Sequence, residues 1–124
     1  MVVVMIVGIV AAFAVPNYTK SVERAHRKDA ENNLILIHAA QQLYAARNNG
    51  SYMPSAAGND ALAQINANLG LNIIANGMIY TCPGGGVFFR CNAMRDGGTV
   101  FIITITADPL SATNPECSIP GTCP

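Results

Sequence analysis

The pattern of apolar and polar positions divides the first half of the chain into three parts. Residues 1–15 carry no charged and no strongly polar side chain, and a highly charged stretch follows them. Farther along, apolar residues recur at three- and four-residue spacing in two overlapping series, which are Leu36, Ala40 and Leu43, and Ile37, Ala40 and Tyr44. This spacing predicts a helix with one apolar stripe that packs on the rest of the domain.

The predicted helix is unusually long. Nothing between residues 17 and 47 breaks a helix, and the sequence Asn-Asn-Gly at 48–50 is suited to end one. We therefore predict a single helix over residues 1–47, about 70 Å long. A domain of this size cannot cover such a helix with its own mass, so much of the helix must project.

The second half of the chain predicts a small antiparallel sheet. An Asn or Asp before an Ala/Leu-rich stretch indicates a short helix at about residues 60–68. Residues 78–82 and 87–94 are β-prone and flank the sequence Pro-Gly-Gly-Gly, which predicts a hairpin. Residues 99–107 are apolar on both faces at their start, as in a central or well-covered strand. Residues 108–124 hold four of the seven prolines and are expected to be a loop.

Together these elements predict an α+β fold. In this fold a long N-terminal helix packs on a small antiparallel sheet of three to four strands. We expect residues 1–19 to be the apolar half of the helix. Residues 20–124 are expected to form a globular head with the second helix half, a loop, the sheet and a tail closed by cysteines.

The four cysteines are Cys82, Cys91, Cys117 and Cys123. Their spacing fits neither the C-x-x-C units of zinc sites nor haem attachment. An even number of cysteines in a small, loop-rich region indicates disulfides and an oxidising compartment, and four allow three pairings. We favour Cys82 with Cys91 and Cys117 with Cys123, because each pair flanks a short turn-rich stretch. Four free thiols in a cytosolic protein are the alternative.

Composition, charge and residue spacing argue against nucleic-acid binding, catalysis and metal binding. Seven basic and seven acidic residues give a net charge of zero, so no specific nucleic-acid binding is predicted. His26 and His38 lie on the long helix with no Ser or Cys nucleophile near them in sequence. The carboxylates form no Asp-x-Asp cluster of the kind that binds Ca²⁺. We therefore expect no enzyme activity, no cofactor and no metal site.

The first eighteen residues resemble the N-terminal segment of type IV pilins and of the related pseudopilins of type II secretion. The shared pattern is a Val/Ile-rich run, a glycine, an Ala-rich segment, a proline and then a tyrosine, matched here by Val2 to Val4, Gly8, Ala11 and Ala12, Pro16, and Tyr18. The resemblance covers about the first 50 residues closely and the rest only in layout. It implies a subunit that polymerises through its N-terminal helix into a type IV pilus-like extracellular filament for adhesion, motility or DNA uptake. The alternative is a pseudopilin of type II secretion, or a membrane-anchored binding domain that forms no long fibre.

One part of the family pattern is missing. Mature family members open with Phe-Thr-Leu-Ile-Glu-Leu, and about six such residues ahead of Met1 would lengthen the apolar span to about 21 residues, enough for a bilayer. The family also implies a cleaved basic leader and a methylated N-terminus. Its partners would be identical subunits, the inner membrane before assembly and the pilus assembly machinery. Residues 20–28 would then lie outside the membrane, although the positive-inside rule alone predicts the opposite orientation.

The resemblance and the apolar pattern together give a set of assembly residues. Those expected in the filament core are Met1, Val4, Met5, Gly8, Ala11, Ala12, Phe13, Val15, Pro16 and Tyr18. Because Gly8 and Pro16 are weak points in a helix, we expect the stretch between them to lose helical hydrogen bonds in the filament. The charges at Lys20, Glu23, Arg24, Arg27 and Lys28 have two interpretations. They either form a solvated face with internal pairs such as Glu23 to Arg27, or they pair across subunits and set their register.

Overall fold

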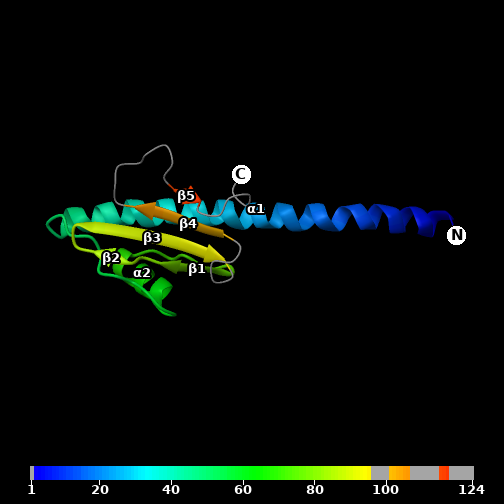
Figure 1. Cartoon of the computed structure of the whole chain (residues 1–124). Helices are drawn as coiled ribbons and strands as arrows, with labels where there is room; N and C mark the ends of the chain where they lie inside the picture. Colours follow the sequence, from blue (N-terminus) through cyan, green and yellow to red (C-terminus); the bar gives the residue numbers. More distant parts are fainter. Residues whose placement is uncertain (1, 96–100, 107–114, 118–124) are drawn as a thin grey trace.

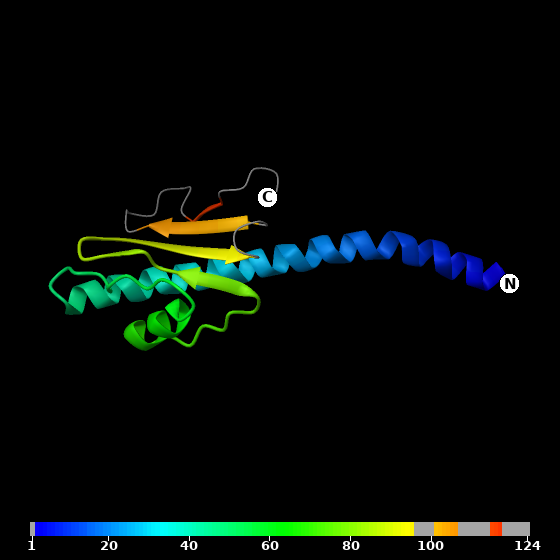
Figure 2. The same ribbon diagram turned by 60° about the horizontal axis from the view of Figure 1, so that its bottom comes forward.

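The fold is a long helix with a small head built on its C-terminal part (Figure 1). This computed structural model describes residues 2–95, 101–106 and 115–117, with side chains except at 14–17 and 101. Helix α1 spans Val2–Arg47 without a break in its helical backbone, including at Pro16. At about 1.5 Å per residue its 46 residues extend roughly 69 Å. The predicted single helix and its projection beyond the head are confirmed (Figure 2).

Helix α1 ends where the sequence predicted. The backbone N–H of Gly50 donates to the carbonyl of Ala45 at 2.8 Å, and the side-chain amide of Asn48 donates to the carbonyl of Tyr44 at 2.8 Å. Asn49 and Gly50 both have positive φ, of 53° and 82°. These bonds satisfy carbonyls that the end of a helix leaves open, and the left-handed residues turn the chain back toward the head.

The head contains an antiparallel sheet. Its strands are β1 (Met78–Thr81), β2 (Gly84–Gly85), β3 (Phe88–Arg95), β4 (Phe101–Thr106) and β5 (Glu116–Cys117). They are ordered β1-β3-β4-β5, and β2 also pairs with β3. The α+β fold class is confirmed, and the three longer strands fall where the sequence predicted strands. The expected loop at 108–124 was wrong at 116–117, because two residues there pair with Ile103 and Thr104 of β4; the remainder of this tail lies outside the described residues.

The second helix and the segment after it cover one side of the head. Helix α2 spans Ala61–Leu69, one residue from the predicted range, and Gly70 ends it with a φ of 66°. Asn66 then exchanges two hydrogen bonds with the backbone of Ile73, at 2.9 and 3.0 Å. These bonds hold the chain between α2 and β1 against α2.

One face of the sheet packs on α1. The inward residues of the sheet alternate along its strands and are Met78, Tyr80, Phe89, Cys91, Ala93, Ile103 and Ile105. The facing residues of α1 are Ala30, Leu34, Ile37, Gln41 and Ala45, spaced by three or four. The predicted contact between the helix stripe and the sheet is therefore confirmed. Of the two predicted series, the one with Ile37 and Tyr44 faces the core, and the one with Leu36 and Leu43 does not.

The error concerns Leu36 and Leu43, which were expected in the core and are about half exposed. Residues 34–46 offer two apolar series on opposite sides of the helix, and spacing alone does not say which one faces the sheet. The buried series includes a polar residue, Gln41, whose burial depends on a hydrogen bond to a distant segment. That partner is invisible to helical periodicity.

Candidate assembly surface

The N-terminal half of α1 is an exposed apolar surface. Its large apolar side chains are 57–76% exposed, and they are Val2, Val3, Val4, Met5, Ile6, Val7, Ile9, Val10, Phe13 and Tyr18. At 1.5 to 3 kcal/mol for each side chain, moving ten of them out of water would stabilise the chain by roughly 15–30 kcal/mol. A surface of this size is far larger than the patches that soluble monomers leave open. It requires a membrane, other helices, or both.

Helix α1 is long and apolar enough to cross a membrane, judged by its length and composition. Among its described side chains, none in the most apolar stretch of 18 residues is buried within the chain. The uncharged run is longer than the fifteen strictly apolar residues, because the first charge is Lys20. A continuous helix over residues 2–19 therefore offers 18 uncharged residues.

Small residues interrupt this apolar surface. Ala11 and Ala12 are exposed, and a Cβ added at Gly8 would meet no atom within 4 Å. Such positions let the backbones of neighbouring helices approach closely. Of the other predicted core residues, Met1 lies outside the described residues, and the side chains of Val15 and Pro16 lie outside the described side chains.

The charged band follows directly along α1. Lys20, Arg24 and Lys28 are exposed, whereas Glu23 and Arg27 are partly buried. Lys28 pairs with Glu31, three residues along the helix, at 3.0 Å. The ion pair of Glu23 is with Arg95 at the end of β3, at 3.2 Å. Part of this band therefore ties α1 to the head, a contact that the sequence interpretation, with Arg27 as the partner of Glu23, did not find.

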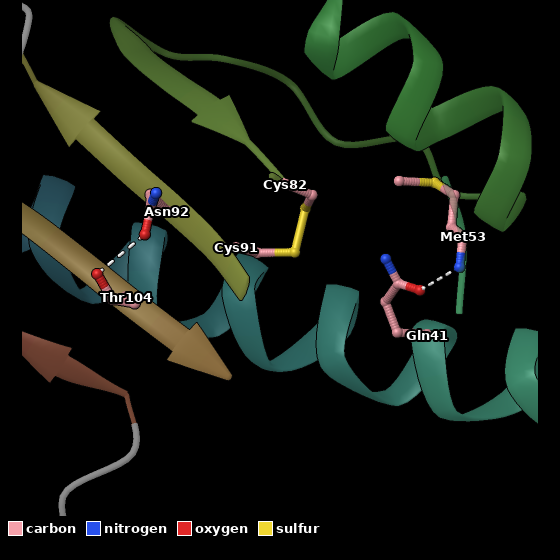
Figure 3. The surroundings of a disulfide bond; sticks show 6 residues. All are labelled: Gln41, Met53, Cys82, Cys91, Asn92 and Thr104. Carbon is pink, nitrogen blue, oxygen red and sulfur yellow. Dashed lines mark hydrogen bonds between the residues drawn. A yellow bond between two sulfur atoms is a disulfide. The ribbon is translucent and has the colours of Figure 1, made fainter. Parts of the chain in front are cut away.

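A disulfide joins two strands beside the core. Cys82, directly after β1, is bonded to Cys91 in β3, with 4.0 Å between their Cα atoms (Figure 3). Both residues are buried. This predicted pair is confirmed. Cys117 is also disulfide-bonded, and its predicted partner, Cys123, lies outside the described residues.

Two hydrogen bonds and one ring contact position the second half of α1 in the head. The side-chain oxygen of Gln41 accepts a hydrogen bond from the backbone N–H of Met53 (Figure 3). Asn33 donates to the Tyr80 hydroxyl at 2.9 Å, and burial raises the pKa of that phenol. The ring of His38 lies 5.5 Å from the ring of Phe89, and burial lowers the pKa of this histidine. His38 therefore packs against the core residue Phe89.

The head also carries two features that the sequence did not predict. A groove of about 270 Å³, called here the 70–77 groove, runs between α1 and the chain that follows α2, and its walls include Asp29, Leu36 and Ile74. In the turn between β2 and β3 Val87 is 91% exposed, and Phe88, the first residue of β3, is 44% exposed. The apolar residues that follow the glycine-rich turn were the sequence signal that could have revealed the exposed Val87 and Phe88. No sequence signal pointed to the groove.

In the part of the chain that the structure describes, residues of the types that bind metal ions are scattered. Within residues 2–95, 101–106 and 115–117, no three His, Cys, Asp or Glu side chains are placed to hold a metal ion together. The features that stand out are instead the apolar half of α1, the charged band and the two surfaces of the head. No family model matches the chain, and no curated protein or solved structure is significantly similar to it.

Proposed function

We propose that this chain is a structural subunit that polymerises through the apolar half of α1 into a type IV pilus-like extracellular filament. The observation that carries the proposal is the apolar half of α1, whose described side chains are exposed and which projects from the head. The resemblance of the first eighteen residues to type IV pilins points to the same arrangement. The proposed partners are identical subunits, the inner membrane before assembly and a pilus assembly machinery.

The energetic argument concerns where the apolar half-helix resides before and after assembly. A bilayer and a bundle of apolar helices both exclude water, so transfer between them carries little hydrophobic cost. Release into water would instead expose the apolar side chains of the N-terminal half of α1, at a cost of roughly 15–30 kcal/mol. Assembly is then an exchange between two dry environments, in which close packing at Gly8, Ala11 and Ala12 favours the filament.

A second candidate is a membrane-anchored domain, including a pseudopilin, that makes no long fibre. The observation that favours it is the length and apolar character of α1. In that case the small residues of α1 have no assembly role. The head alone would act outside the membrane.

Bulky substitutions distinguish the two candidates. Ala11→Leu and Ala12→Leu keep the segment apolar but fill the space in which helices would approach. We expect the double variant to stay in the membrane fraction and to lose the surface filaments seen by electron microscopy of sheared material. Val10→Leu is the matched control, since it changes one already large exposed residue.

The opposite outcome is equally clear. Wild-type protein that yields no filaments and remains monomeric in detergent would remove the filament proposal and leave the anchored domain. The sequence upstream of residue 1 provides a separate check. A basic leader ending in Gly before Phe-Thr-Leu-Ile-Glu would support prepilin processing.

A further inference from the structure

The head has an apolar projection at one end. Gly86 and Val87 form the turn between β2 and β3, since Gly85 pairs with Phe88. The carbonyl of Gly86 accepts a hydrogen bond from the N–H of Tyr52 at 2.7 Å, which places this turn beside the end of α1. The turn therefore lies at the end of the molecule opposite the N-terminus (Figures 1 and 2).

Two arginines belong to the described residues near this end. Arg90 lies close to the projection, with its guanidinium carbon 6.0 Å from the centre of the Phe88 ring. Arg47 occupies the last turn of α1. Residues 32–59 and 61–95 contain no Asp or Glu at all. The projection, defined as Gly86–Phe88, is thus an exposed apolar tip with arginines beside it.

The 70–77 groove has the complementary character. Leu36, Leu71 and Ile74 form its apolar part, and Ile74 is 67% exposed. Asp29 lies at its wall and makes no ion pair among the described residues. The bonds between Asn66 and Ile73 hold the outer wall in place, so the groove exists before anything binds.

The tip and the groove are separated along the axis of the molecule. The groove residues of α1 precede Arg47 by 11 to 18 positions, which corresponds to about 15–30 Å along the helix. The segment from α2 to β1 also runs toward the N-terminal side of the head in both views (Figures 1 and 2). One copy therefore cannot place its own rigid turn in its own groove.

We infer that the projection of one subunit docks in the 70–77 groove of the next copy of this chain. Val87 and Phe88 would cover Leu36, Leu71 and Ile74, and Arg90 would approach Asp29. Different surfaces meet in such a contact, so each added copy leaves one free tip and one free groove. Contacts of this heterologous kind build open chains unless they close into a ring. The inference rests on the proposed filament and assigns its head-to-head contact.

Cross-linking between engineered cysteines tests this contact. In the double variant Val87→Cys and Ile74→Cys, a short bismaleimide applied to intact filaments is expected to give a ladder of covalent oligomers on a denaturing gel. Each single variant should give no ladder. With only one kind of cysteine present, a cross-link would require two projections or two grooves of neighbouring subunits to touch each other. The matched control replaces Ile79, another exposed isoleucine outside the groove, in the pair Val87→Cys and Ile79→Cys.

A charge exchange provides a second, independent measurement. Asp29→Arg is expected to lower the ladder yield about tenfold, since like charges then face each other across a partly buried contact. Adding Arg90→Asp to the same chain should restore most of the yield. Rescue of this kind separates a direct pairing from a general loss of folding.

The outcomes keep the two proposals apart. Filaments that form normally but give no ladder would overturn the docking of tip in groove and leave the filament proposal standing. A ladder that the Ile79 control reproduces would also overturn it. A chain that gives neither filaments nor ladder in the membrane would remove both.

Discussion

The side-chain oxygen of Gln41 accepts a hydrogen bond from the backbone N–H of Met53 at 3.0 Å, and both residues are buried. This bond joins the C-terminal part of α1 to the segment that returns from its end. Within the described residues, the amide nitrogen Nε2 of Gln41 has no hydrogen-bond partner. A buried polar side chain on the apolar face of α1 therefore makes one described hydrogen bond, through its acceptor oxygen.

Replacing this acceptor tests its contribution. Gln41→Met keeps much of the volume but leaves the N–H of Met53 buried without a partner, so we expect the free energy of unfolding to fall by about 1–3 kcal/mol. Urea unfolding followed by tyrosine fluorescence of the full chain in detergent measures it, since the chain has no tryptophan. Gln42→Met, on the exposed neighbour, is the matched control. An increase in stability would mean that removing the unpaired Nε2 outweighs the lost bond.

The Cys82–Cys91 disulfide should stabilise the head. The bond closes a short loop, with a sequence separation of 9. We expect Cys82→Ala with Cys91→Ala to lower the free energy of unfolding by about 2–4 kcal/mol, toward the lower figure because the loop is short. The comparison uses the variant and wild-type protein in oxidising buffer, since a reductant would also act on Cys117. Identical urea midpoints would contradict the prediction.

The burial of His38 predicts a dependence of stability on pH. Because burial lowers the pKa of this histidine in the folded state below its ordinary value of 6.5, the unfolded chain binds the proton more readily. The free energy of unfolding should therefore be fully retained above about pH 6.5 and should decline as the pH falls from there toward the lowered folded pKa. In His38→Gln the part of the pH dependence due to this group should disappear. A wild-type stability that rises on acidification would indicate that the imidazolium gains more from the Phe89 ring than it loses by burial.

Gly85 lies where two chain segments approach closely. A Cβ at this position would come within 3.2 Å of the carbonyl oxygen of Met53 and of the Cα of Pro54, and its φ is 153°. At Gly86, where φ is 74°, an added Cβ would meet nothing within 4 Å. We expect Gly85→Ala to reduce the free energy of unfolding by about 1–3 kcal/mol more than Gly86→Ala does. Equal losses in urea unfolding would show that backbone strain alone decides both.

The stretch from Gly8 to Pro16 should change on assembly. It is helical in the single chain, but glycine weakens a helix and proline removes a hydrogen-bond donor. In the proposed filament we expect residues from about 8 to 16 to lose helical hydrogen bonds. A filament structure with an unbroken helix through this stretch would contradict the expectation, and faster amide exchange there in filaments than in detergent would support it.

The sequence was most informative where the signal was local. The long helix, its end after Arg47, helix α2 and strands β1, β3 and β4 were predicted from periodicity, turn residues and β-propensity. The Cys82–Cys91 pair followed from its position around a turn. These features depend on residues that are close together in the chain.

Predictions that needed distant partners were less accurate. The sequence offered Arg27 as a partner for Glu23, but the ion pair formed with Arg95, which is 72 positions away. The predicted stripe of α1 included Leu36, Leu43 and Ile37, but only Ile37 of these three is buried. The sheet packs on Ile37 together with Leu34, which the spacing had not singled out. Leu36, which is exposed, instead lines the 70–77 groove.

By itself the sequence determined three features of this chain. They are a half-helix with too much apolar surface to remain exposed to water, a charged band next to it, and a small α+β head. Only the tertiary structure decided which face of α1 is covered, which charges join the helix to the head, and where the exposed tip and the groove lie. The physical reason is that helical periodicity and turn chemistry are properties of neighbouring residues. The choice between two apolar faces depends instead on the shape and hydrogen-bonding groups of segments that meet only after the chain has folded.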